Sequence, residues 1–188
     1  MHRKRCGDLL EAFLQICKSG NMSPRPYLLI VGDGEERAAL ESRAREAKPG
    51  DVLFLGFRNQ TELPPLYDLC NVFVLASVDE PWGLVINEVM NAGRAVIVTD
   101  QVGCQGDLVQ TGVNGCVIGA RDVEGLAHSL RIILADEQTW QAMGAQSLRI
   151  IKDFTFNQNV VALRTALQMV VPGFSAASMN ETYSDQVH

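Results

Sequence analysis

The sequence predicts an α/β fold: a parallel, doubly wound, Rossmann-like sheet with helices on both faces. Short apolar runs alternate with longer segments of helical periodicity along most of the 188 residues. The run YLLIV, residues 27–31, is continuously apolar, as in a strand that is buried on both faces of a sheet. Glycines follow directly after the runs, where parallel strands end and where such folds bind their ligands.

Five apolar runs are predicted to be strands. The first follows a Pro-rich turn, and the last is entered through the turn Asn114-Gly115 and is expected at an edge of the sheet. The predicted strands span residues 27–31, 52–56, 72–77, 95–100 and 115–119.

The segments before, between and after these runs have helical spacing. Thr61 and Asp122 are placed to cap two helices at their N-termini, and Gly93 is placed to end a third. The predicted helices span residues 8–19, 32–47, 61–70, 83–93, 122–136, 137–154 and 157–171, with a short turn or helix near 105–112. Residues 172–188 lose this periodicity, so we expect one domain over 1–171 followed by a flexible tail.

The composition narrows the class of protein. Hydrophobic residues make up 47% and charged residues 20%, as in soluble globular proteins, and a net charge of −6 argues against nucleic acid as a partner. No apolar run is long enough to span a membrane, and the basic start lacks the apolar core of a secretory signal. Five cysteines without a CxxC pair predict neither a disulfide framework nor a metal site, and favour a cytoplasmic location.

The stretch EPWGLVINE places two carboxylates, Glu80 and Glu88, around a predicted helix start at Gly83. The free N–H groups of Gly83, Leu84 and Val85 would form an anion site that suits a diphosphate. Carboxylates beside a diphosphate must face neutral hydrogen-bond donors, and sugar hydroxyls fit that requirement. Spacing alone leaves a structural role open, because the helix dipole also favours a glutamate in the first turns.

The segment EPWGLVINEVMNAG resembles the E-x7-E segment of the large group of retaining glycosyltransferases with the GT-B fold. Further segments resemble that family in order, among them LLIVGDGEERAALE, VLFLGFRNQTELPPLYDLCNVFVLAS and AVIVTDQVGCQGDLVQTGVNGCVI. The resemblance runs from about Leu9 to about Leu167 and covers the C-terminal, donor-binding half of such an enzyme, including its last helices.

The resemblance implies roles for the residues of EPWGLVINE. Glu88 would hold the ribose hydroxyls of the donor, and Glu80 would contact the transferred sugar as the catalytic carboxylate. The backbone amides of Gly83, Leu84 and Val85 would face the diphosphate or the sugar.

Other positions are implied to line the cleft. Phe57 and Arg58 would lie near the nucleobase, and Gly32 and Gly34 would line the donor site. The chain departs from the family pattern at Ala95, at Cys104 and at Asp107, and we read these departures as sequence drift outside the carboxylate pair.

The first residues of the chain differ more strongly from the family pattern. The family has a strand and an arginine before the first helix, and a lysine just before the glycine that opens it, whereas here Cys6 precedes Gly7. The nearest cations are Arg3, Lys4 and Arg5, which could neutralise a diphosphate leaving group. A solvated basic start without a role is the alternative.

The sequence therefore predicts the donor-binding domain of a retaining hexosyltransferase that uses a UDP-, GDP- or ADP-sugar and needs neither a metal nor a cofactor. The acceptor, a glycan, a lipid or a small molecule, would bind a second domain, so the isolated chain is expected to be inactive or nearly so. The whole enzyme could associate peripherally with a membrane. Two alternatives are a non-catalytic, truncated nucleotide-sugar-binding fragment and a sugar-nucleotide epimerase of the same fold.

Overall fold

The computed structural model describes residues 2–20 and 22–171. The chain divides into two compact units, with the boundary between Ile151 and Lys152. All five strands lie in the first unit, and the tail expected for 172–188 lies outside the described residues.

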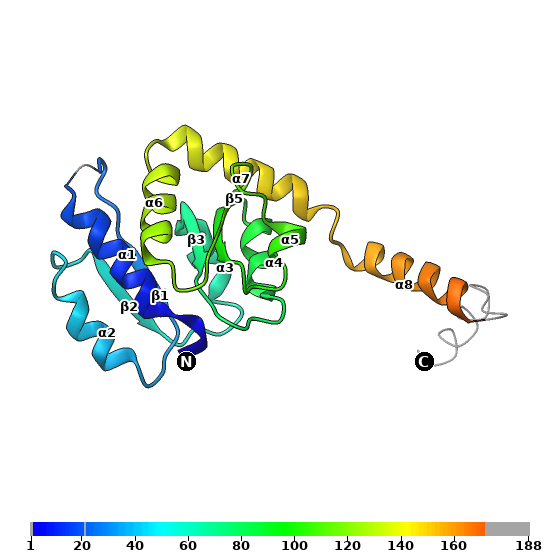
Figure 1. Cartoon of the computed structure of the whole chain (residues 1–188), viewed down its shortest axis with the longest axis horizontal. Helices are drawn as coiled ribbons and strands as arrows, with labels where there is room; N and C mark the ends of the chain where they lie inside the picture. Colours follow the sequence, from blue (N-terminus) through cyan, green and yellow to red (C-terminus); the bar gives the residue numbers. More distant parts are fainter. Residues whose placement is uncertain (1, 21, 172–188) are drawn as a thin grey trace. The chain divides into compact units, whose positions relative to one another are not determined.

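The five predicted strands are all present, each with its predicted position to within two residues (Figure 1). They are β1 (Leu28–Val31), β2 (Val52–Gly56), β3 (Val72–Leu75), β4 (Ala95–Thr99) and β5 (Gly115–Ile118).

The predicted helices are present as well. They are α1 (Cys6–Lys18), α2 (Arg37–Ala44), α3 (Leu63–Leu69), α4 (Leu84–Asn91), α5 (Gln105–Leu108), α6 (Val123–Ile133), α7 (Glu137–Ile151) and α8 (Phe156–Val170), preceded by the 3-10 turn η1 (His2–Lys4).

All strand pairs are parallel, as predicted, but within the described residues they form two sheets, β1-β2 and β3-β4-β5. β5 lies at an edge, as predicted. β1 and β3 do not pair with each other. Both strands line the same two cavities, of about 460 and 420 Å³.

Helices cover both faces of the three-stranded sheet. Ala95 and Ile97 of β4 pack with α1 and α6, which lie side by side in Figure 1. Val96 and Val98 point to the opposite face, where α4 and α7 pack on β4. Every residue of β4 is buried as a result, which explains why its first four residues, 95–98, are all apolar.

The start of α2 differs from the prediction. The sequence predicts a helix from residue 32, whereas α2 begins at Arg37. Gly32 has φ of 121° and Gly34 has φ of 159°, backbone conformations outside the helical region. The five residues before Arg37 therefore form a loop at the carboxyl end of β1.

The two predicted caps have different outcomes. Asp122 caps α6, because its carboxylate accepts a hydrogen bond of 2.8 Å from the Gly125 amide. The prediction for Thr61 is wrong: Glu62 occupies the N-cap position of α3, and the Thr61 hydroxyl donates instead to Oδ1 of Asn59, at 2.6 Å. Asn59 forms a turn before the helix, in which its Oδ1 atom also accepts hydrogen bonds from the amides of Thr61 and Glu62. The Thr61 hydroxyl binds within this turn and does not cap α3.

The C-terminal end of α4 is fixed against α7. A Cβ atom on Gly144 would lie 2.1 Å from the carbonyl oxygen of Gly93, so only glycine allows this approach. The Ser147 hydroxyl donates to the Arg94 carbonyl at 2.7 Å. These contacts hold α4 on the sheet and thereby set the position of its N-terminus.

No helix among the described residues has both the length and the apolar character that crossing a membrane requires.

Candidate functional site

The N-terminus of α4 lies at the carboxyl ends of the strands. Gly83 is its N-cap residue, with φ of 91°, and a Cβ atom there would lie 3.0 Å from the Val102 side chain and 3.1 Å from that of Leu75. The amides of Gly83, Leu84 and Val85 donate no hydrogen bond to another described residue. Leu84 is 71% exposed. The predicted anion site is thus a helix end whose first amides have no acceptor among the described residues.

Glu80 lies on the loop between β3 and α4, and its backbone is held by the loop that follows β4. Its amide donates to the Gln101 carbonyl at 3.0 Å, and its carbonyl accepts from the Gly103 amide at 2.9 Å. A Cβ atom on Gly103 would lie 1.9 Å from the Pro81 carbonyl oxygen, so this contact requires glycine. The two loops fix the backbone from which the Glu80 side chain extends.

The N-terminal segment contacts the same loop. The Val78 amide donates to the Arg3 carbonyl at 2.8 Å, and the Arg3 guanidinium donates to the Asp79 carbonyl. The Lys4 ammonium forms an ion pair with the Glu80 carboxylate. Arg3 and Lys4 therefore reach the predicted site and are not simply solvated.

Arg5 behaves differently from its two neighbours. Its guanidinium pairs with Asp8 in the first turn of α1, at 2.7 Å. That hydrogen bond raises the pKa of Arg5 above its ordinary value. Arg5 therefore stabilises the start of α1 and does not serve the loop of Glu80.

Glu88 is exposed on α4, and its Oε2 atom accepts a hydrogen bond of 2.6 Å from the Tyr67 hydroxyl of α3. Tyr67 is only 6% exposed. Burial, together with the hydrogen bond to the Glu88 carboxylate, raises the pKa of Tyr67 well above its usual range. Its phenol therefore stays protonated and acts as a donor.

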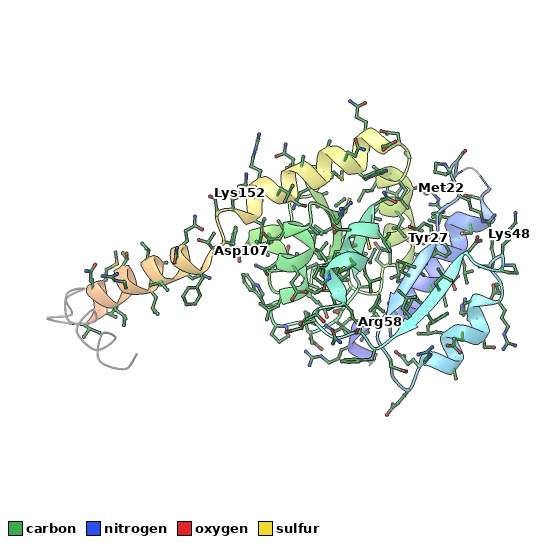
Figure 2. The ribbon with its side chains drawn as sticks, turned by 180° about the vertical axis from the view of Figure 1, so that it is seen from behind. Met22, Tyr27, Lys48, Arg58, Asp107 and Lys152 are labelled. Carbon is green, nitrogen blue, oxygen red and sulfur yellow. The ribbon has the colours of Figure 1, made fainter. Side chains whose placement is uncertain are left out.

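A cavity of about 460 Å³ lies between the two sheets and opens beside these groups. Five of the predicted site residues line it: Gly32, Gly34, Phe57, Arg58 and Val85. Figure 2 shows Arg58 at the opposite end of the first unit from Met22 and Tyr27, which precede β1. The lining loops thus gather at the carboxyl ends of β1 and β2, as the glycine positions predict.

The remaining predicted residues, Glu80, Glu88, Gly83 and Leu84, do not line this cavity. Two lining residues connect the carboxylates to it, since Lys4 pairs with Glu80 and Tyr67 binds Glu88. The structure therefore places the two glutamates at the border of the cavity and not inside it.

The lining residues that the sequence analysis did not assign to the site include Tyr67 and Arg37. Tyr67 lies in α3, and the sequence of this helix does not indicate that the phenol of Tyr67 contacts Glu88. Arg37 lies in the first turn of α2, where it pairs with Asp33 at 3.1 Å and with Glu41 at 2.8 Å. With Lys4 and Arg58, it brings a third cation to the cavity. Within the described residues, no group of three candidate ligands could hold a metal ion.

Cys104, one of the three positions where the chain departs from the family pattern, is fully buried. Burial raises the pKa of its thiol to about 11. Ala95 is also fully buried, in the central strand β4, and Asp107 is exposed on α5. None of the three lines the cavity.

Comparison with known proteins identifies the family. Residues 1–149 match the family described as Glycosyl transferases group 1. The lipopolysaccharide core biosynthesis glycosyltransferase LpsE of Rhizobium meliloti is 34% identical over 137 residues, which cover 72% of this chain and 37% of that protein. The glycogen synthase of Mycobacterium tuberculosis is 34% identical over 145 residues, covering 76% of this chain and 34% of the synthase. The chain thus spans about a third of the length of these relatives.

Solved structures agree in fold. A sucrose-phosphate synthase from Thermosynechococcus elongatus superposes with a TM-score of 0.72 and 28% identity, covering 90% of this chain and 42% of that one. Anabaena HepE, solved in complex with UDP and glucose, superposes with a TM-score of 0.72 and 25% identity, covering 90% of this chain and 45% of that one. The parallel α/β architecture is that of GT-B glycosyltransferases, and the chain belongs to the group 1 family of glycosyl transferases.

Proposed function

We propose that this chain is the donor-binding domain of a retaining glycosyltransferase that transfers a hexose from a nucleotide-diphosphate sugar to an acceptor hydroxyl. The observation that carries the proposal is the open N-terminus of α4, with Glu80 and Glu88 on either side and a cavity of about 460 Å³ next to it. Helix amides attract a diphosphate, and carboxylates accept hydrogen bonds from sugar hydroxyls. Both kinds of group are present within one short segment.

The nucleoside would occupy the cavity side of the site. Phe57 is 77% exposed at the end of β2, so its ring is free to stack on a base, and Arg58 lines the cavity beside it. Glu88 would accept hydrogen bonds from the ribose hydroxyls. The complex of HepE with UDP and glucose supports UDP-sugars as the first donors to test.

The sugar and the diphosphate would lie towards Glu80. The carboxylate of Glu80 would bind hydroxyls of the transferred sugar, as the catalytic residue of the pair. The ammonium of Lys4, which is about half exposed, lies close enough to Glu80 to face the diphosphate as well. Backbone amides and this cation would stabilise the leaving group, so the proposed chemistry needs no metal and no cofactor.

The acceptor, whether a glycan, a lipid or a small molecule, would bind a part of a longer protein that lies outside this sequence. Transfer by the isolated chain is therefore expected to be absent or very slow. A protein that binds a nucleotide sugar and catalyses no transfer is the second candidate. The described cysteines are all free thiols, which supports a reducing, cytoplasmic location.

A thermal-shift panel with UDP, GDP, ADP and their glucose, mannose and N-acetylglucosamine conjugates tests the proposal. A ligand that binds only the folded state at one hundred times its Kd adds about 2.7 kcal/mol of stability. We expect one nucleotide family to raise the Tm, and Glu88→Ala to remove most of that rise. Glu46→Ala is the matched control, because Glu46 pairs with Lys18 and does not line the cavity. No shift with any nucleotide, or an equal shift in Glu88→Ala, would contradict the proposal.

A further inference from the structure

We propose that Tyr67 is a positioning residue of the donor site, whose phenol holds one carboxylate oxygen of Glu88 and leaves the other oxygen to a ribose hydroxyl. The inference rests on the proposed function, since it needs Glu88 to bind ribose. It goes further by naming the group that makes this carboxylate selective for a diol.

Packing holds the phenol of Tyr67 in place. The ring is buried and lies edge-on to the ring of Phe73 in β3, with the ring centroids 6.3 Å apart and an interplanar angle of 88°. Both rings line the 460 Å³ cavity. A hydroxyl on so confined a ring has little freedom to move, whereas the carboxylate of Glu88 sits on an exposed side chain. The tyrosine therefore orients the glutamate, and not the reverse.

The geometry of the bond fits a neutral donor on an ionised acceptor. The O···O distance between Tyr67 and Glu88 is 2.6 Å, within the short range expected when a hydroxyl donates to a carboxylate. A carboxylate offers about four lone-pair positions, of which the phenol uses one on Oε2. Among the described residues no other donor contacts the Glu88 side chain, so Oε1 stays available to a ligand.

The two glutamates of the site thus have partners of different charge. Glu80 has the cation Lys4, whereas Glu88 has a neutral phenol. A cation would compensate the charge of the carboxylate and compete with ligand hydroxyls for its oxygens. A neutral donor fixes the orientation and leaves the negative charge in place, which strengthens hydrogen bonds from a ribose diol and repels a phosphate.

A purely structural role would make a different prediction. A buried tyrosine hydroxyl needs a partner, and Glu88 could simply supply one. In that case the removal of the hydroxyl would leave nucleotide affinity unchanged, because the freed carboxylate is exposed and solvated. In a positioning role, the removal weakens only those ligands that have ribose hydroxyls.

Calorimetric titration of the 188-residue chain with UDP and with 2′,3′-dideoxyuridine 5′-diphosphate separates these roles. Tyr67→Phe is expected to raise the Kd for UDP about tenfold, as for a misplaced hydrogen bond to a charged group. It should leave the Kd for the dideoxy nucleotide unchanged, and it should have no further effect in a Glu88→Ala background. Tyr27→Phe is the matched control: its hydroxyl is exposed and only weakly bonded, at 3.4 Å from the Leu69 carbonyl.

Three results would overturn the inference, and they differ in what they leave intact. If Glu88→Ala weakens UDP binding and Tyr67→Phe does not, the proposed function stands and the role of Tyr67 is structural. If Tyr67→Phe weakens both nucleotides equally, the phenol acts elsewhere than on the ribose contact. If UDP, GDP and ADP all fail to bind the wild-type chain, the proposed function fails together with the inference.

Discussion

Lys4 and Glu80 form an ion pair although 76 positions separate them in the sequence. The pair joins the first turn of the chain to the loop that leads into α4. Because Lys4 also lines the cavity next to this loop, its ammonium lies where the proposed diphosphate would need a counter-charge. Under the proposed function the pair is part of the donor site, and the alternative role is a contact that only stabilises the fold.

Replacement of Lys4 by alanine should separate these two roles. The Lys4 side chain is 48% exposed, so loss of the pair should cost less than about 1 kcal/mol of stability. We expect the Kd for UDP to rise about fivefold. Uridine, which binds more weakly and has no diphosphate, should keep the same Kd. The effect should shrink in 1 M salt. Lys18→Ala, which breaks the distant pair with Glu46, should change neither Kd.

Replacement of Gly103 by alanine should destabilise the loops around Glu80. The added Cβ atom would meet the Pro81 carbonyl oxygen at 1.9 Å, and the backbone of both loops would have to move. A loss of more than about 2 kcal/mol is expected in urea denaturation, with weaker nucleotide binding in the folded fraction. Gly106→Ala is the control, since nothing lies within 4 Å of its added Cβ atom. A stable Gly103→Ala variant would show that the loops tolerate displacement.

The buried thiol of Cys104 should make stability depend on pH in the alkaline range. Its pKa is raised from 9.0 to about 11 by burial, so the unfolded chain loses this proton first as the pH rises. The protonated thiol contributes about 2 to 3 kcal/mol to the free energy of unfolding. This contribution is complete below pH 9 and is lost as the pH rises towards 11. Urea titrations across this range should show a smaller loss for Cys104→Ala than for the wild type. Equal slopes would mean that the thiol is not protected.

Asn114 should be more important for the fold than for the site. Its buried side chain accepts from the Gln110 amide at 2.8 Å and donates to the Leu108 carbonyl at 2.9 Å. Asn114→Ala leaves these groups unpaired, and we expect a loss of about 2 to 4 kcal/mol. Nucleotide Kd, measured well below the Tm, should match that of the wild type. A raised Kd would show that the loop before β5 communicates with the donor site.

Much of the fold could be predicted from the sequence because its signals are local. The run AVIV is apolar at four successive positions, which favours a strand covered on both faces, and β4 is buried throughout. The cap at Asp122 is also local, since its partner lies three residues away. The prediction for Thr61 was wrong for a related reason: another local hydrogen bond, to Asn59, competes for the same hydroxyl.

The partners of the site residues could not be predicted in the same way. Tyr67 and Glu88 belong to different helices and meet only once β3 has placed both, and the sequence gives no sign of that contact. The same holds for Lys4, whose position near Glu80 depends on how η1 packs on the loop. The division of the strands into two sheets is likewise a matter of which edges meet in space.

The division of the strands into two sheets has a consequence for the association of this protein in solution. Within the described residues, β1 pairs only with β2 and β3 only with β4, so each of these two strands presents a row of peptide groups that no neighbour satisfies. Such rows act as templates for strand addition, and here they flank an apolar hollow. Solutions of the chain should therefore be sensitive to protein concentration, with reversible self-association that light scattering would detect before any precipitate forms.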